Sequence, residues 1–233
     1  MSIATYIKEI GRGKEGARAL TQEQAHDLMS QVLDGRVTDL EIGAFAIAMR
    51  IKGETTDELA GFLQAAHERC IGLHPQHPMV VLPSYNGARK LPNLTTLLAL
   101  LLSQEGVPVL VHGPEHDPGR VTTAEIFQTL GLPSASDAGD IHAAWQRREP
   151  VFIRTEALCP PLARLLDARR VIGLRNPAHT VAKLLVPGPQ SPSMRVVNYT
   201  HPEYGTMLTG FLGQTLANAM LLRGTEGEPV ADP

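Results

Sequence analysis

Three stretches within residues 1–70 place apolar side chains three or four positions apart, the spacing of one face of an α-helix. Each stretch follows a threonine with Gln or Glu three residues later, the pattern of a capping box. We expect three short helices whose apolar stripes face a core. The expected caps are Thr21 with Gln24, Thr38 with Glu41, and Thr55 with Glu58, and the expected stripes are Ala25, Leu28, Met29, Val32 and Leu33, then Leu40, Ala44, Ile47, Ala48 and Ile51, then Leu59, Phe62, Leu63 and Ala66.

From about residue 74 onward, short apolar runs alternate with longer helical patterns, which is typical of a mainly parallel sheet flanked by helices. We therefore expect an α/β fold with a separate small all-helical domain: residues 1–73 helical, residues 74–233 α/β. A last strand without a following helix leads us to expect the α/β domain to continue beyond residue 233. Strands are predicted over 79–82, 107–111, 151–154, 194–199 and 220–223, and helices over 94–102, 122–130, 141–148, 162–169 and 203–217.

Composition describes an ordinary soluble globular protein, with 43% hydrophobic and 19% charged residues. Cys70 and Cys159 lie far apart in the sequence and form no metal-binding motif. The longest apolar run, residues 97–102, is too short to span a bilayer. We expect a cytoplasmic protein that does not interact with membranes.

Charge is unevenly distributed along the chain. The net charge is −3, but residues 147–195 contain nine basic and three acidic residues. A locally basic segment in an acidic chain is compatible with a polyanion-binding surface, but charge alone favours a solvated face paired to acidic neighbours. The basic residues are Arg147, Arg148, Arg154, Arg164, Arg169, Arg170, Arg175, Lys183 and Arg195.

Residues 20–69 resemble the N-terminal helical domain of anthranilate phosphoribosyltransferases. The most specific pieces are LDGRVTDLEIGAF and AMRIKGETTDEL, and a weaker resemblance continues through the whole chain. The resemblance implies a small helical domain attached to a larger α/β domain, with homodimers formed through the helical domain.

The phosphoribosyl-pyrophosphate site of those enzymes is degenerate here. Their first strand ends in GTGGD, a glycine-rich loop that cradles pyrophosphate, whereas this chain has PSYNGA at residues 83–88. Tyr85 and Asn86 are bulky, so we expect no backbone nest for a pyrophosphate. Their KHGN segment appears as VHGP, and their serine-rich segment appears as GRVTTAE, where Glu125 adds a negative charge. The residues of the degenerate loop are Ser84, Tyr85, Asn86, Gly87, Ala88, His112, Gly113, Arg120, Thr122 and Thr123.

The metal-binding pair of those enzymes, adjacent Asp and Glu, is missing from the corresponding segment GTEGEP, residues 224–229. The segment RRVIGLR does resemble the enzyme segment in which arginine binds the acceptor carboxylate, with Arg170 and Arg175 at the matching positions. IKEIGRGKEGARALT and NPAHTVAKLLVPG further resemble the YbiB-like branch, which implies sequence-independent DNA binding.

We therefore expect a non-catalytic protein without a cofactor, which binds DNA or RNA through its phosphates. The candidate contacts are Arg12, Lys14, Arg18, Arg89, Lys90, Arg169, Arg170, Arg175 and Lys183.

Two alternatives remain open. In a divergent phosphoribosyl or glycosyl transferase, which would need Mg²⁺, the phosphate cradle would consist of Ser84, Asn86, Gly87, Thr95 and Thr123. In a small-molecule sensor, Arg170 and His112 would hold a carboxylate.

Overall fold

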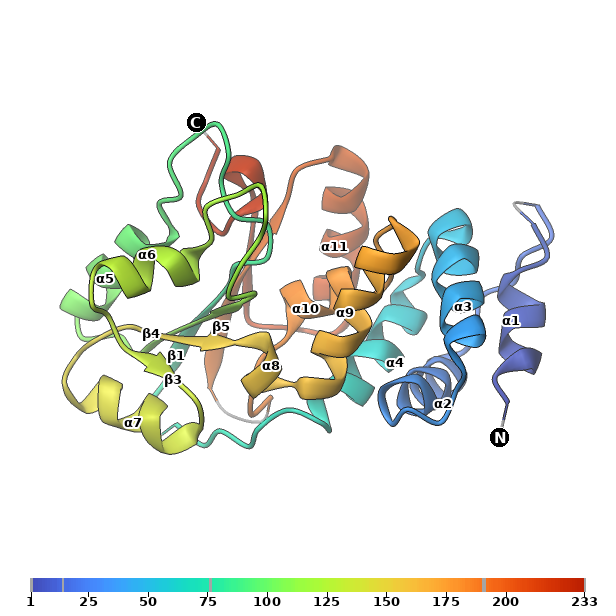
Figure 1. Ribbon diagram of the computed structural model, residues 1–233, viewed down its shortest axis with the longest axis horizontal. Helices are drawn as coiled ribbons and strands as arrows, with labels where there is room; N and C mark the ends of the chain where they lie inside the picture. Colours follow the sequence, from blue (N-terminus) through green and yellow to red (C-terminus); the bar gives the residue numbers. More distant parts are fainter. Residues whose placement is uncertain (1, 14, 76, 190–191, 233) are drawn as a thin grey trace. The chain divides into compact units, whose positions relative to one another are not determined.

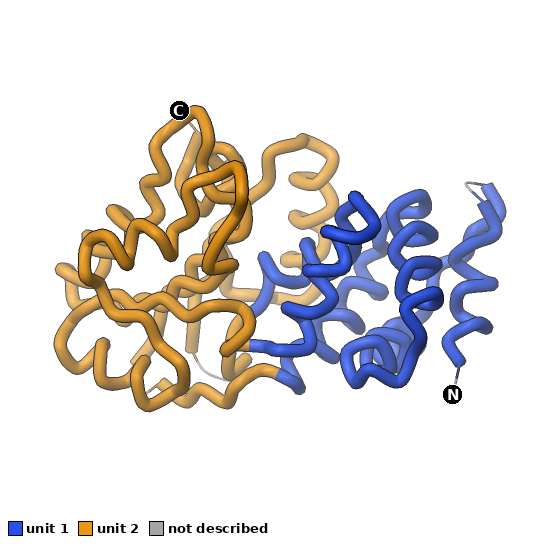
Figure 2. The backbone as a smooth tube through the Cα atoms, viewed as in Figure 1, with its two compact units in different colours: residues 1–69, 159–185 blue, residues 70–158, 186–233 orange. Residues whose placement is uncertain are grey.

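The structure is a computed structural model that describes residues 2–13, 15–75, 77–189 and 192–232. It divides into two compact units (Figure 2). The helical unit comprises residues 1–69 and 159–185, and the sheet unit comprises residues 70–158 and 186–233. The sequence predicted a single boundary at residue 73. The division differs because residues 159–185 pack with the N-terminal helices and not with the sheet.

The helical unit contains the three capped helices predicted from the sequence. Thr21, Thr38 and Thr55 each accept a hydrogen bond from the N3 amide, and each N3 side chain reaches back to the cap, so all three capping boxes are confirmed. Two short helices at the unit's start and end were not predicted. The helices are α1 (Ala4–Ile10), α2 (Gln22–Leu33), α3 (Asp39–Lys52), α4 (Thr56–His67), α9 (Pro160–Ile172) and α10 (Ala178–Leu184) (Figure 1).

The expected stripes of α2 and α4 are buried, but the stripe expected on α3 is wrong. Leu40 is 84% exposed and Ile51 is 61% exposed, whereas Phe45 and Met49 on another face are buried. Phe45 packs edge-on against Phe62 of α4, with ring centroids 5.8 Å apart. Since α3 carries apolar residues on more than one face, spacing alone does not identify the buried one.

The sheet unit is a six-stranded sheet in the order β3-β4-β2-β1-β5-β6, and every neighbouring pair is parallel. The five predicted strands are present; the two-residue β3 was not predicted. The strands are β1 (Met79–Pro83), β2 (Val109–Gly113), β3 (Ser134–Ala135), β4 (Val151–Arg154), β5 (Ser193–Tyr199) and β6 (Ala219–Arg223), and the helices are α5 (Thr95–Gln104), α6 (Thr123–Thr129), α7 (Ala138–Gln146), α8 (Thr155–Leu158) and α11 (Pro202–Gln214), with a 3₁₀ turn, η1 (Thr225–Gly227).

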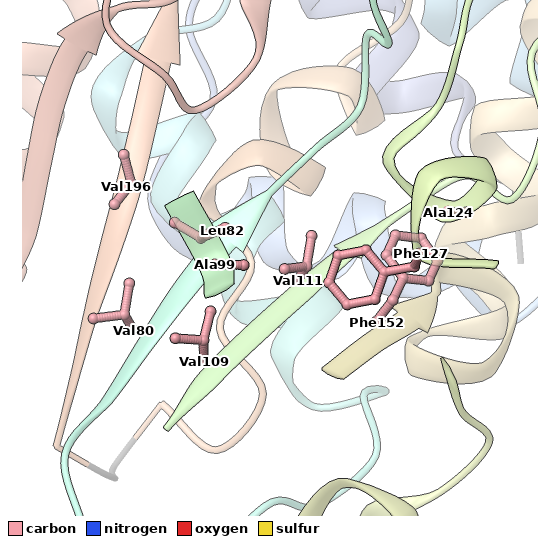
Figure 3. Close-up of a cluster of buried hydrophobic side chains, with 9 residues drawn as sticks. All are labelled: Val80, Leu82, Ala99, Val109, Val111, Ala124, Phe127, Phe152 and Val196. Carbon is pink, nitrogen blue, oxygen red and sulfur yellow. The ribbon is translucent and has the colours of Figure 1, made fainter. Parts of the chain in front are cut away.

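One face of this sheet packs against α5 and α6 (Figure 3). Alternate residues of the central strands point into this layer, where Ala99 of α5 and Phe127 of α6 meet them. The Phe127 and Phe152 rings lie 5.9 Å apart between centroids. β1 and β2 are buried along their whole length, as expected for parallel strands covered on both faces.

Candidate functional site

The candidate site lies in the loops at the carboxyl edge of the sheet. β1 is flanked by β2 and β5, so the chain builds outward from β1 in both directions. In open parallel sheets, this change of direction leaves a crevice beyond the strand ends, where ligands bind. The loop that follows β1 is therefore the expected position for a ligand.

The loop after β1 contains a backbone anion nest, and the carboxylate of Glu228 occupies it. The Gly87 and Asn86 amides donate to Glu228 Oε1 at 2.6 and 2.9 Å. The Ser84 hydroxyl donates to Oε2, and Thr95 Oγ1 donates to the same oxygen at 3.3 Å. We call these four donors the loop nest. The expectation that Tyr85 and Asn86 would leave no nest is thus wrong, because their side chains are directed elsewhere.

Tyr85 is turned toward His112 at the end of β2. Its hydroxyl lies 3.0 Å from His112 Nδ1 and accepts a hydrogen bond from Thr155 Oγ1 at 3.2 Å. The two rings meet edge-on, with centroids 5.5 Å apart. The Asn86 side-chain amide donates to the carbonyls of Glu226 and Gly227. Neither side chain takes the place of the anion.

Close approach explains why glycine stands at two of the predicted positions. Gly87 has a φ of +64°, and a Cβ there would lie 2.9 Å from the Val121 carbonyl oxygen. A Cβ on Gly113 would collide with the carbonyl oxygen of Ser84. Both glycines therefore let the loop pack tightly against its neighbours.

Most other residues predicted for the degenerate loop surround the nest. Thr123 Oγ1 lies 2.7 Å from Ser84 Oγ, and Arg120 Nη1 donates to the Gly87 carbonyl at 3.1 Å. Ala88 pairs with Val121 through two backbone hydrogen bonds.

Thr122 and Glu125 serve helix α6 instead. They form the capping box at its start, and Glu125 also lies 2.6 Å from His116 Nδ1. The carboxylate of Glu125 therefore caps α6 and contacts the His116 ring, a structural role that comparing the motifs did not anticipate.

The sequence search for a metal pair overlooked Glu226 and Glu228. The Glu226 carboxylate accepts hydrogen bonds from the Arg89 amide at 2.5 Å and the Lys90 amide at 3.1 Å. These bonds lower the pKa of Glu226, and the bond from Arg89 has the larger effect. The available signal was a pair of acidic residues two positions apart, three and five residues after a strand that ends at the ligand edge.

The residues around the loop do not fit a magnesium–pyrophosphate complex. Four of the five donors required by the transferase alternative already bind Glu228, and the fifth, Thr123, contacts Ser84. Within the described part of the chain, no group of three or more His, Cys, Asp or Glu residues is arranged to hold a metal ion.

A second group of predicted residues gathers in the helical unit. Arg169 and Arg170 lie in the last turn of α9, Arg175 follows it, and Lys183 lies in α10. We call these four residues the α9–α10 cluster. The pKa of His179 in α10 is lowered to about 4. The main cause is burial, and the positive charges of Arg175, Arg169 and Lys183 lower it further. Arg170 also lies 3.2 Å from Asp167.

The remaining residues predicted to contact nucleic acid are not part of the α9–α10 cluster. Arg12 and Arg18 share the carboxylate of Glu9, at 2.6 and 3.8 Å. Arg89 and Lys90 are exposed but belong to the sheet unit. Lys14 lies outside the described residues. Arg170 and His112, the pair required by a carboxylate sensor, belong to different units, and His112 is fully buried beside Tyr85.

A helical unit and a parallel sheet with an anion nest after its first strand define a class: proteins with the anthranilate phosphoribosyltransferase fold. Residues 4–70 match the helical bundle domain of a glycosyl transferase family. Anthranilate phosphoribosyltransferase from Thermus thermophilus superposes with a TM-score of 0.76 at 21% identity, covering 94% of this chain and 66% of that one. The Saccharomyces cerevisiae enzyme in complex with PRPP and Mg superposes with a TM-score of 0.76 at 14% identity, covering 97% and 67% of the two chains.

Sequence comparison narrows this class. The Escherichia coli protein YbiB is 44% identical over 236 residues, which cover 100% of this chain and 74% of YbiB. The anthranilate phosphoribosyltransferase of Symbiobacterium thermophilum is 28% identical, covering 95% of this chain but only 64% of the enzyme. The chain belongs to the anthranilate phosphoribosyltransferase-like superfamily, in the branch that contains YbiB. Its scaffold is that of a phosphoribosyltransferase. None of the helices in the described residues is both long and apolar enough to cross a membrane.

Proposed function

We propose that this protein binds nucleic acid without base specificity and is not a transferase. The observation that carries the proposal is the α9–α10 cluster: four basic residues at the end of α9, after it and in α10, of which the three arginines are exposed. Nucleic-acid phosphates neutralise such clusters and release counterions, which provides affinity without reading the sequence.

Charge and composition favour phosphate contact over base stacking. Two arginines and the lysine of the cluster act on one half-buried histidine ring, so a polyanion placed there would meet several positive charges at once. Aromatic residues make up only 4% of the chain, which disfavours a single-strand binder that stacks bases on aromatic rings. The proposed ligand is DNA or RNA recognised through its backbone, with no cofactor.

The transferase alternative is disfavoured by the occupant of the loop nest. Glu228 uses the amides and hydroxyls that a pyrophosphate would need, and its negative charge would repel the donor. A phosphoribosyl donor with Mg²⁺ would have to displace a carboxylate that is only 2% exposed.

We further propose a cytoplasmic homodimer formed through the helical unit. The stripe of α3 that was expected in the core is exposed, including Leu40, Ile47 and Ile51. Burying these side chains against a second copy would remove apolar surface from water. Replacing Leu40 and Ile51 together by glutamate should give monomers in sedimentation velocity, and a dimer in that variant would reject this contact.

Binding of labelled duplex DNA at about 50 mM and about 200 mM salt tests the main proposal. The test variant replaces Arg169, Arg175 and Lys183 by glutamine. If all three contact phosphates, the negative slope of log K against log salt should become shallower by about 2.7, at about 0.9 per contact. The matched control replaces Arg147, Arg154 and Arg223, which pair with carboxylates in the sheet unit.

A proton NMR titration of His179 adds a readout independent of affinity. Bound phosphates should raise the pKa of His179 from about 4, because they offset the positive charges that lower it. The proposal is rejected if DNA does not bind at the lower salt, or if the cluster variant binds as the control variant does.

A further inference from the structure

The segment that follows β6 bends back over the loop after β1 and inserts two carboxylates into it. Glu228 occupies the loop nest, and Glu226 accepts hydrogen bonds from the amides of Arg89 and Lys90 further along the same loop. Each glutamate thus contacts a pair of neighbouring amides of a single loop, and the Ala88 amide between the two pairs donates to the Val121 carbonyl. Such runs of amides are the groups with which proteins bind phosphate oxygens.

The Glu228 carboxylate makes the contacts of a bound anion. One oxygen accepts two amides, and the other accepts the hydroxyls of Ser84 and Thr95. The side chain is 2% exposed, and Ser84 and Thr95 are buried as well. Buried donors without an acceptor would cost free energy, so this loop requires an anion or an equivalent acceptor.

The inserted segment contains a residue in an unfavourable backbone conformation. Glu226 has a φ of +52°, in the left-handed region that residues other than glycine rarely adopt. The segment is closed by backbone hydrogen bonds from Thr225 to Val230 at 2.8 Å and from Asp232 to Arg223 at 2.9 Å. A strained residue maintained by many hydrogen bonds is compatible with a specific role for its side chain.

We propose that Glu228 is a built-in anionic ligand that keeps a phosphate site closed, and that removing its carboxylate lets the loop nest bind inorganic phosphate. The nest keeps the donors that tetrahedral oxyanions use, two amides and two hydroxyls. Only the Glu228 carboxylate, which occupies the space in front of these donors, prevents a phosphate from accepting the same hydrogen bonds. This inference concerns the sheet unit and does not depend on nucleic-acid binding.

Thermal unfolding in phosphate and in chloride at equal ionic strength tests the inference. In Glu228→Ala, phosphate at about ten times its Kd should raise the melting temperature by about 3–6 °C relative to chloride. The wild type and the control Glu149→Ala, which removes an exposed carboxylate paired with Arg147, should show only the small general effect of phosphate. An equal response of all three proteins overturns the inference.

Glu228→Gln provides a second, independent variant should Glu228→Ala not fold in either buffer. It keeps the volume of the side chain but cannot present two acceptor oxygens to the four donors. Its melting temperature should be lower than that of the wild type and should not respond specifically to phosphate. A melting temperature equal to that of the wild type would show that the nest does not require an anion, and would also overturn the inference.

Discussion

His179 should make the stability of the helical unit depend on pH between about 6.5 and 4. Burial and the charges of Arg175, Arg169 and Lys183 lower its pKa in the folded state to about 4, whereas an unfolded histidine titrates near 6.5. In this window the unfolded chain binds the proton more readily, so stability falls as the pH falls. From pH 7 to pH 5 the expected loss in free energy of unfolding is about 2 kcal/mol.

Urea unfolding at pH 7 and pH 5 measures this loss, with His179→Gln as the control. The variant lacks the titrating ring but keeps a polar side chain near the Asn176 backbone amide, which donates a hydrogen bond to His179 Nδ1 at 3.3 Å in the wild type. Subtracting its pH dependence from that of the wild type removes the contribution of all other titrating groups. A difference near zero would refute the conclusion that His179 is kept neutral by burial and by the α9–α10 cluster.

Two further substitutions test the cores of the two units. Phe127→Ala removes a ring that is 1% exposed and packs against Phe152, so the urea unfolding free energy should drop by about 3–5 kcal/mol, and a loss below about 1 kcal/mol would contradict the packing described. Lys52→Met leaves the fully buried carboxylate of Glu58 without the ammonium group 2.5 Å away, and the expected loss at pH 7 is about 3–5 kcal/mol; circular dichroism melts that match the wild type would refute a buried ion pair.

Local sequence signals predicted the elements of the fold well. The capping boxes at Thr21, Thr38, Thr55 and Thr122 each start a helix, because a cap satisfies backbone donors within four residues and needs no distant partner. The valine-rich strands were likewise identifiable from their continuous apolar runs. These features depend on short-range chemistry, which is visible in the sequence.

Features that depend on distant partners were not predicted. The buried face of α3 is chosen by the ring of Phe62, seventeen positions after Phe45, and not by the spacing within α3. The packing of residues 159–185 with the helical unit likewise depends on residues far away in the sequence and has no local signal. Motif comparison identified the loop of Ser84 to Ala88 but not its occupant, since Glu228 lies 141 residues after Gly87.

The occupant of the loop nest resolves an apparent conflict between the sequence and the fold. The loss of most glycines from a loop suggests the loss of its anion-binding geometry, yet amides that point into a buried space need an acceptor whatever side chains surround them. Glu228 meets that need from within the chain, so the backbone geometry can persist without an external phosphate. A missing glycine motif therefore indicates that the ligand differs, and does not by itself indicate that the nest is gone. Here the ligand is a carboxylate of the chain itself, bound to Asn86 and Gly87.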